Sequence, residues 1–238
     1  MARMKFMNTE IDNLTMQETL QAIDQLIREN KSAYVVTPNV DHIVQLETNK
    51  ELQAVYKNAS LILTDGKPLL WIANWYGTPI KEKISGSDLF PLLCKMAAEK
   101  GYKMFFLGAA EGVAAKAAEN LMNRFKGLQV TGTYSPPFGF EKDPVEMDKI
   151  KSMIKASGAD ILIVGLGCPK QEKFMYHHCA ELGVPISFGL GASFDFEAGN
   201  IKRAPRWMAN HGLEWLFRIT QDPKRMAKRY LVDDRKIL

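Results

Sequence analysis

Short apolar runs alternate with segments of helical periodicity along most of this chain, and that alternation limits the folds open to it. The runs have strand character, and most of them end in glycine or in small polar residues. They cover residues 34–37, 61–64, 103–107, 128–134, 161–167 and 184–190. Between them, apolar positions recur three and four residues apart, as in amphipathic helices. The pattern predicts an α/β fold with a Rossmann-like parallel sheet of about six strands and helices on both faces.

The chain changes character near residue 198, where the strand signals stop. We expect an α/β catalytic domain in residues 1–197 and a basic, amphipathic helical appendage in residues 198–238. The first 199 residues carry 21 Lys and Arg against 23 Asp and Glu, whereas the remaining 39 carry 10 against 4. The net charge of +4 is therefore a property of the tail. A basic tail indicates an anionic partner, such as a phosphorylated ligand, a membrane surface or nucleic acid.

The tail predicts two helices. The first runs from about residue 203 to Pro223 and has Trp207 and Trp215 on a broad apolar side, and a short second helix follows. An apolar face with tryptophans, opposite a cationic face, is typical of a helix that lies in a membrane interface. Packing of the same helices on the domain, or on a sister subunit in a homo-oligomer, is the alternative.

The bulk composition indicates a protein of a reducing cytoplasm. No run of 18 apolar residues is present, so no segment is expected to span a membrane, and the N-terminus lacks the apolar core of a signal peptide. Three cysteines, an odd number without C-x-x-C spacing, argue against a disulfide framework or a zinc site.

Asp65 is the first candidate for chemistry. Residues 61–68, LILTDGKP, form an apolar strand followed by a carboxylate, a glycine for a tight turn and a proline that suits the first turn of a helix. Strand-to-helix junctions of this kind lie at the edge of an open α/β sheet where ligands bind. The alternative is that Asp65 only caps the helix that follows. Further along, Ser87 or Asp88 is expected to cap a helix that ends at Gly101.

Other polar and glycine residues follow the predicted strands in the same way. Such convergence at one rim suits a nucleotide-linked substrate, although each residue singly is as well explained as a cap or turn residue. The strand-end residues are Thr37, Asn39, Asp41, Asp65, Gly108, Gly165, Gly167, Lys170, Gln171, Ser193 and Asp195, with Lys83 and Ser87 in a nearby loop.

Familiar motifs are weak or absent. The stretch GLGCPK at 165–170 begins like a dinucleotide fingerprint but has Lys170 at the third glycine position, and no P-loop is present. Asp195-Phe196-Glu197 is the nearest approach to an acidic metal–diphosphate motif, and most such runs are solvated. Cys168 is expected to be a small helix-capping residue rather than a reactive thiol, because no histidine follows nearby in the sequence.

Five motifs in their combined order and spacing resemble the WecG/TagA/CpsF glycosyltransferases of family 26. They are TPNVD at 37–41, TDG at 64–66, SGSD at 85–88, GLGCPKQE at 165–172 and RAPRW at 203–207. The tail segments GLEWLFR, DPKR and RY agree as well, so the resemblance covers roughly residues 8–232.

The resemblance implies an inverting transferase that is cytoplasmic and peripheral on the inner face of the plasma membrane. In the TagA branch, N-acetylmannosamine passes from its UDP donor to undecaprenyl-diphosphate-linked N-acetylglucosamine, giving the ManNAc-β1,4-GlcNAc linkage unit of wall teichoic acid. It implies no metal and no cofactor. Asp65 would be the base, with Thr37 and Asn39 beside it, and Gln171 would lie near the donor. Lys83 stands where relatives carry Arg, which weakens bidentate binding of a diphosphate there.

Without a metal, cations and backbone N–H groups must stabilise the departing UDP. The candidates are the helix starts after Gly108 and Gly167, together with Lys83, Arg203, Arg206, Arg218 and Arg225. The expected partners are the UDP-sugar, the lipid acceptor and an anionic membrane surface.

Three alternatives stay open. In the first, the same fold serves another donor, UDP-N-acetylmannosaminuronate or UDP-glucose, and a donor panel decides between them. A non-catalytic nucleotide-sugar sensor or membrane scaffold would bind UDP but release no UDP over time with any lipid acceptor. A nucleic-acid binder fits the basic tail, but the tryptophans share an apolar helix side rather than a basic groove, so no nucleic-acid partner is expected.

Overall fold

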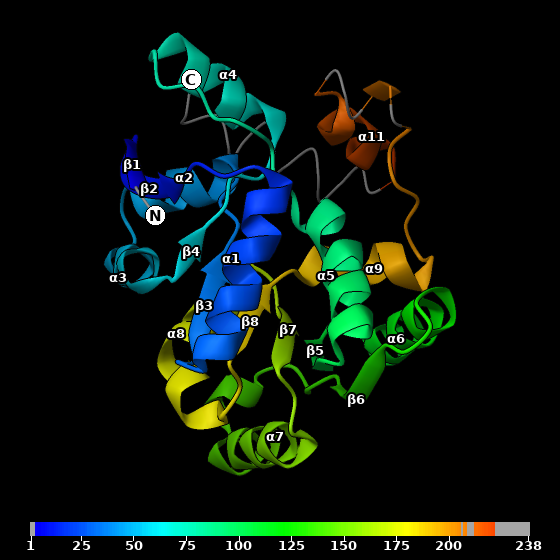
Figure 1. Cartoon of the computed structure of the whole chain (residues 1–238). Helices are drawn as coiled ribbons and strands as arrows, with labels where there is room; N and C mark the ends of the chain where they lie inside the picture. The colour runs from blue at the N-terminus through cyan, green and yellow to red at the C-terminus, as the bar shows by residue number, and fades with distance from the viewer. Residues whose placement is uncertain (1–2, 206, 209–211, 222–238) are drawn as a thin grey trace.

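The computed structural model describes residues 3–205, 207–208 and 212–221, and it shows the predicted α/β architecture (Figure 1). A central sheet of six parallel strands is covered by helices on both faces. The strands are β3 (Ala33–Val36), β4 (Leu61–Ile62), β5 (Lys103–Gly108), β6 (Gln129–Tyr134), β7 (Ile161–Gly165) and β8 (Ile186–Gly189). Their spatial order is β4-β3-β8-β7-β5-β6, so the predicted Rossmann-like parallel sheet is confirmed.

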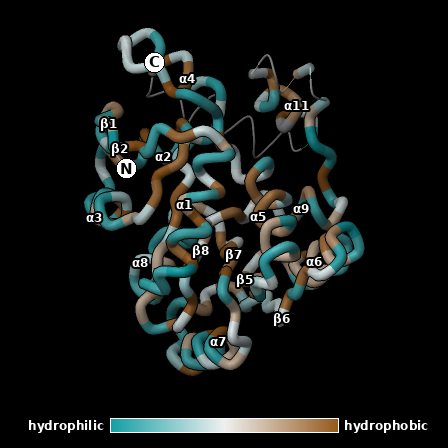
Figure 2. Tube along the Cα trace, viewed as in Figure 1, coloured by the Kyte–Doolittle hydropathy of each residue, from teal (hydrophilic) through white to brown (hydrophobic). Residues whose placement is uncertain are grey.

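Two apolar cores lie on opposite faces of this sheet because side chains alternate along each strand. In β7, Ile161 and Ile163 belong to one core, whereas Leu162 and Val164 belong to the other. Figure 2 shows hydrophobic colours in the central strands and hydrophilic ones on the outer helices. The first core packs against α1 (Met16–Glu29), α5 (Gly86–Lys100), α6 (Val113–Arg124) and α9 (Gly191–Ala198), and the second against α3 (Lys50–Asn58), α4 (Lys67–Trp75), α7 (Pro144–Ser157) and α8 (Lys170–Leu182). Burial on both faces explains why the inner strands β3, β5, β7 and β8 read as apolar runs.

Capping residues determine where the helices begin and end. Thr15 is the N-cap of α1 and forms a capping box with Glu18. Helix α5 ends at Gly101 as predicted, but its N-cap is Ser85, so the expectation of a cap at Ser87 or Asp88 is wrong. Asp88 instead lies in the first turn of α5, where its carboxylate is favoured by the helix dipole and accepts a hydrogen bond from the Ser85 hydroxyl.

A short hairpin at the N-terminus, which the sequence did not predict, covers an edge of the sheet. It consists of β1 (Arg3–Phe6) and β2 (Thr9–Asp12), paired antiparallel. Asp12 Oδ2 accepts a hydrogen bond of 2.8 Å from the N–H of Ile62 in the edge strand β4. Arg3 donates to the carbonyl of Ser60 at 3.0 Å. Side chains of the hairpin therefore satisfy backbone groups that a further strand would otherwise pair with.

The tail departs from the predicted continuous helix. Residues 207–208 are helical, a turn follows at Gly212, and α11 runs from Glu214 to Gln221. Gly212 has φ +72°, which L side chains rarely adopt, and a Cβ there would lie 2.6 Å from the ring of Trp71. The chain therefore turns at Gly212 instead of continuing one helix. The predicted second tail helix lies outside the described residues.

The predicted domain boundary between residues 197 and 198 falls at the end of α9. This helix packs against α5 and α6, so it is part of the α/β unit. No helix in the described part of the chain is long and apolar enough to cross a bilayer.

Candidate functional site

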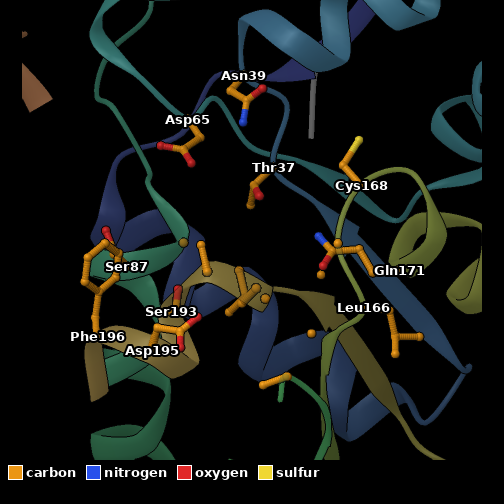
Figure 3. A pocket seen from close by; sticks show the side chains of 18 of the residues that line it. Thr37, Asn39, Asp65, Ser87, Leu166, Cys168, Gln171, Ser193, Asp195 and Phe196 are labelled. Atoms are coloured by element: carbon orange, nitrogen blue, oxygen red, sulfur yellow. The ribbon is translucent and has the colours of Figure 1, made fainter. Parts of the chain in front are cut away.

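A pocket of about 450 Å³ lies at the carboxyl ends of β3, β4, β7 and β8 (Figure 3). From β3 the chain goes to β4 at one edge of the sheet, and it then crosses to β5 on the other side of β8 and β7. The connections between strands therefore change direction next to β3 and β8. Ligands of open α/β sheets bind at such a point. The lining consists of Thr37, Asn39, His42, Asp65, Gly86, Ser87, Ala109, Gly165, Leu166, Gly167, Cys168, Gln171, Gly189, Leu190, Gly191, Ala192, Ser193, Asp195, Phe196, Ile201 and Gln221.

Glycines let backbone segments approach one another around this pocket. A Cβ on Gly165 would lie 2.6 Å from two ring carbons of Phe194. A Cβ on Gly191 would lie 3.1 Å from the Cα of Gly165, and a Cβ on Gly189 would lie 2.8 Å from the side-chain nitrogen Nε2 of Gln171. The ends of β7 and β8 therefore pack closely against the start of α9 and against the Gln171 side chain, which lines the pocket.

We expect Gly165→Ala to destabilise the fold. The ring of Phe194 is fully buried, with ring centroids 5.7 Å from Phe90 and 5.3 Å from Phe106, so it has no room to withdraw. Overpacking of this kind costs about 1–3 kcal/mol, and each kcal/mol lowers the unfolding midpoint by roughly 2–4 °C in a chain of this size. Thermal unfolding followed by circular dichroism measures the shift. An unchanged midpoint would contradict the crowding argument.

Asp65 lies in the loop between β4 and α4, and its backbone is bound to the loop after β3. Its N–H donates to the carbonyl of Pro38 at 2.8 Å. Asp65 therefore lies close to Thr37 and Asn39, and Figure 3 shows these three side chains together on one side of the pocket. The N-cap of α4 is Gly66, so Asp65 lies one residue outside the capping position. The structure therefore favours a role for Asp65 in the pocket over a role as a cap.

Beside these residues, three polar side chains form what we call the His-Cys-Glu cluster: His42, Cys168 and Glu172. The Nε2 of His42 lies 3.3 Å from Glu172 Oε1, which also accepts a hydrogen bond of 2.8 Å from Gln171. Burial lowers the pKa of His42, but hydrogen bonds to Cys168 and Glu172 outweigh it and raise the pKa to about 10. Burial also raises the pKa of the Cys168 thiol.

Sequence reasoning missed this cluster. His42 is 130 positions from Glu172, and the signal was only that both follow strands that prove to be neighbours of β8. The expectation that Cys168 caps a helix is wrong, because the N-cap of α8 is Pro169. Cys168 lies one residue earlier and lines the pocket.

The start of α9 is a second feature that the sequence did not predict. Gly191 and Ala192, in its first turn, line the pocket, and N–H groups at a helix start favour anions. The neighbouring D-x-E run does not act as one acidic group. Asp195 lines the pocket, whereas Glu197 is 7% exposed and forms an ion pair of 2.9 Å with Arg124.

Asp88 joins the tail to the rim of the pocket. Arg203 is paired with Asp88 and also donates to Ser87 Oγ at 3.2 Å, and Lys83 Nζ lies 3.0 Å from Asp88 Oδ2. Burial raises the pKa of Asp88, but hydrogen bonds from Arg203 and Ser85 and the charge of Lys83 lower it to about 2. Ser87 lines the pocket, and both cations contact Asp88 next to it.

Two predicted binding residues point elsewhere. Lys170 Nζ forms an ion pair of 2.7 Å with Glu141 and does not line the pocket. Asp41, in α2 (Val40–Leu46), accepts a hydrogen bond of 3.0 Å from Gln45 and is also outside the lining.

Besides Lys83 and Arg203 at the rim, the remaining predicted binding residues outside the lining are a glycine and three tail arginines. Gly108 shapes the site indirectly, since a Cβ there would lie 2.4 Å from the carbonyl oxygen of Gly165. Arg206 and Arg225 lie outside the described residues. Arg218 is in α11, and its side chain is not among those described. The binding roles of all these residues stay predictions.

The pocket lies in a chain that matches a known family over almost all of its length. The model of the "Glycosyl transferase WecG/TagA/CpsF family" matches residues 4–238. The chain belongs to the WecG/TagA/CpsF family of glycosyltransferases.

Two curated relatives carry the same name, N-acetylglucosaminyldiphosphoundecaprenol N-acetyl-beta-D-mannosaminyltransferase. The protein from Bacillus spizizenii is 33% identical over 226 residues, which are 95% of this chain and 84% of the relative. The protein from Bacillus subtilis is 30% identical over 206 residues, covering 87% of this chain and 77% of the relative.

Four of the five motifs that carry the resemblance to the WecG/TagA/CpsF family contribute residues to the pocket lining. They are the segments 37–41, 64–66, 85–88 and 165–172. The fifth, RAPRW, contributes Arg203, which binds Ser87 and Asp88 at the rim. The fold thus brings together segments separated by up to about 165 residues.

Proposed function

We propose that this glycosyltransferase moves N-acetylmannosamine from UDP-N-acetylmannosamine to undecaprenyl-diphosphate-linked N-acetylglucosamine, with inversion at the anomeric carbon. The observation that carries the proposal is Asp65 in a pocket with Thr37 and Asn39, in a chain with relatives named for this transfer. The product would be the ManNAc-β1,4-GlcNAc unit on its lipid carrier.

Asp65 acts as the general base in this proposal. Its carboxylate takes the proton from the acceptor hydroxyl as the hydroxyl oxygen bonds to the anomeric carbon of the donor. The bond from that carbon to the UDP oxygen breaks at the same time, and UDP leaves with the electron pair. Such a base contributes roughly 10²–10⁴-fold to the rate. Thr37 and Asn39, at the end of β3, are placed to orient the reacting sugars.

The negative charge that develops on UDP needs fixed positive partners. The N–H groups at the start of α9, which lines the pocket, favour such an anion. Lys83 and Arg203 lie at the rim in contact with Asp88, and the diphosphate would compete with Asp88 for them. We propose that the diphosphate is held in this way, without a metal ion bridging it to the protein.

The charge of the pocket favours a neutral donor sugar. Among the described lining residues, there is no Lys or Arg, whereas two carboxylates, Asp65 and Asp195, are present. The extra carboxylate of a uronate donor would meet these like charges, with no Lys or Arg among the described lining residues to pair with it. This favours N-acetylmannosamine over N-acetylmannosaminuronic acid.

A donor panel tests the assignment. The full chain is incubated with a short-chain N-acetylglucosamine-diphosphate lipid and with UDP-N-acetylmannosamine, UDP-N-acetylglucosamine, UDP-N-acetylmannosaminuronate or UDP-glucose, and released UDP is measured. We expect UDP-N-acetylmannosamine to exceed the others in kcat/KM by at least about 10-fold, the usual discrimination from one altered sugar group. A higher value for another donor would overturn the donor assignment, and no acceptor-dependent UDP release would favour a non-catalytic sensor.

We also propose that the enzyme binds peripherally to the inner face of the plasma membrane through α4 and the tail. Trp75 and Tyr76 are 89% and 72% exposed, and Trp207 in the tail is 61% exposed. Trp71 lies against Gly212, so the two elements are neighbours, and Figure 1 shows α4 and α11 at the same end of the molecule. If half of the ten tail cations reach anionic lipid, the attraction is ~5 kcal/mol, which corresponds to reversible attachment.

A further inference from the structure

The His-Cys-Glu cluster has the donor atoms of a metal site. Imidazole, thiol and carboxylate come from α2, from the loop after β7 and from the first turn of α8. One ligand atom from each of His42, Cys168 and Glu172 lies within 4.8 Å of the other two. A single ion bound by nitrogen and sulfur at about 2.0–2.3 Å holds its ligand atoms slightly closer together than this limit.

In the described part of the chain, Glu172 has one oxygen without a partner, although His42 lies beside the other. It is 2% exposed, and its Oε2 has no hydrogen-bond partner among the described residues. A buried carboxylate is costly unless a cation or several hydrogen bonds compensate it. The hydrogen bond from Gln171 and the approach of His42 both involve Oε1, so Oε2 is left for a further ligand.

The surroundings of His42 suit a metal ligand. Its Nδ1 lies 3.0 Å from Asn39 Oδ1 and 3.3 Å from the backbone nitrogen of Asn39. In the tautomer that donates Nδ1–H to Asn39 Oδ1, the Nε2 lone pair is available to an ion, and the Asn39 N–H gives up Nδ1 as its acceptor. Metal-binding histidines usually donate their second N–H to such an acceptor, which fixes the ring. His42 and Cys168 also line the pocket, so a fourth coordination position would open toward it.

We propose that His42, Cys168 and Glu172 bind one Zn²⁺ ion at the wall of the pocket. The mixed nitrogen, sulfur and oxygen set matches zinc, and Mg²⁺, which prefers oxygen ligands alone, does not fit it. On binding, the thiol proton and any proton on Nε2 leave to solvent, so that thiolate, neutral imidazole and carboxylate coordinate the ion. The ion would tie the loop that carries Asn39 to the helix start that carries Gln171, and so hold both pocket residues in place.

Cobalt binding tests this site directly. The full chain, freed of metal with a chelator, is titrated with Co²⁺, which replaces zinc and absorbs light when bound to thiolate. We expect one equivalent to bind with a thiolate-to-cobalt charge-transfer band, and Zn²⁺ to abolish the band. Cys168→Ser should remove the band and weaken binding by at least about 100-fold, the upper end of the cost of losing an outer-shell partner. Cys179→Ser, a partly buried cysteine on α8, is the matched control and should retain both.

A second measurement needs no variant. Zn²⁺ should slow alkylation of Cys168 in the wild-type chain but leave Cys179 of the same molecule unchanged, as followed by mass spectrometry. No stoichiometric binding, binding without the thiolate band, a band retained in Cys168→Ser, or no protection of Cys168 would overturn the proposal. Neither donor nor acceptor is present, so these results are independent of the proposed transferase activity.

Discussion

Asp65→Asn should lower turnover at least about a hundredfold while the chain keeps its fold and its affinity for UDP. The amide has the shape of the carboxylate but cannot take the acceptor proton, and a general base is worth roughly 10²–10⁴-fold, or about 3–5 kcal/mol of barrier. The effect should fall on kcat, with KM for the donor little changed, because the carboxylate acts on the acceptor hydroxyl. Released UDP gives the rate, and calorimetry gives UDP binding.

Asp148→Asn is the control for this experiment. It makes the same substitution at an exposed position on α7, a helix that contributes no residue to the pocket lining, and should leave the rate unchanged. Near-normal turnover by Asp65→Asn would remove Asp65 from the mechanism. A loss of UDP affinity in parallel with the rate would instead indicate a binding role.

Removal of residues 200–238 should leave a folded α/β unit without transferase activity. The cut follows Gly199 because α9 packs on α5 and α6 and belongs to the core. The deleted segment contributes Ile201 and Gln221 to the pocket lining and Arg203 to the rim. We therefore expect at least about a hundredfold loss, as for removal of a charge-stabilising group, even with a short-chain acceptor in the absence of membrane.

Trp207→Ala in the full chain separates membrane docking from completion of the pocket. It should reduce turnover on acceptor embedded in anionic vesicles and spare turnover on the short-chain acceptor, because Trp207 is exposed and outside the lining.

For the chain that lacks residues 200–238, circular dichroism checks that the remaining α/β unit folds. Undiminished turnover by the truncated chain would show that the tail has no part in catalysis.

The sheet was predictable from sequence because its inner strands β3, β5, β7 and β8 are apolar runs buried almost throughout, and the partly exposed edge strand β6 alternates. Less predictable were elements whose cause is tertiary. Helix α9 has a glycine start and little periodicity, and it forms because Phe194 fills a space between Phe90 and Phe106. The tail helix was predicted too long, because the approach of Trp71 to Gly212 is invisible in the sequence.

The site was predictable where polar residues directly follow strands, as Thr37, Asn39 and Asp65 do. Side-chain direction was not predictable. Lys170 and Gln171 are adjacent, yet one pairs with Glu141 outside the pocket and the other lines it, since neighbouring helix positions face different directions. His42 went unnoticed because its partners come from the far half of the chain.

The N-terminal hairpin has a consequence for how this enzyme behaves in concentrated solution. A bare edge strand recruits strands from other molecules, which leads to aggregates. The Asp12 carboxylate accepts the hydrogen bond from the backbone N–H of Ile62 in the edge strand β4. A side-chain carboxylate, unlike the backbone of a further strand, offers no next row of N–H and C=O groups for pairing. The β1–β2 hairpin thus prevents other molecules from pairing with β4, the edge strand that Asp65 follows.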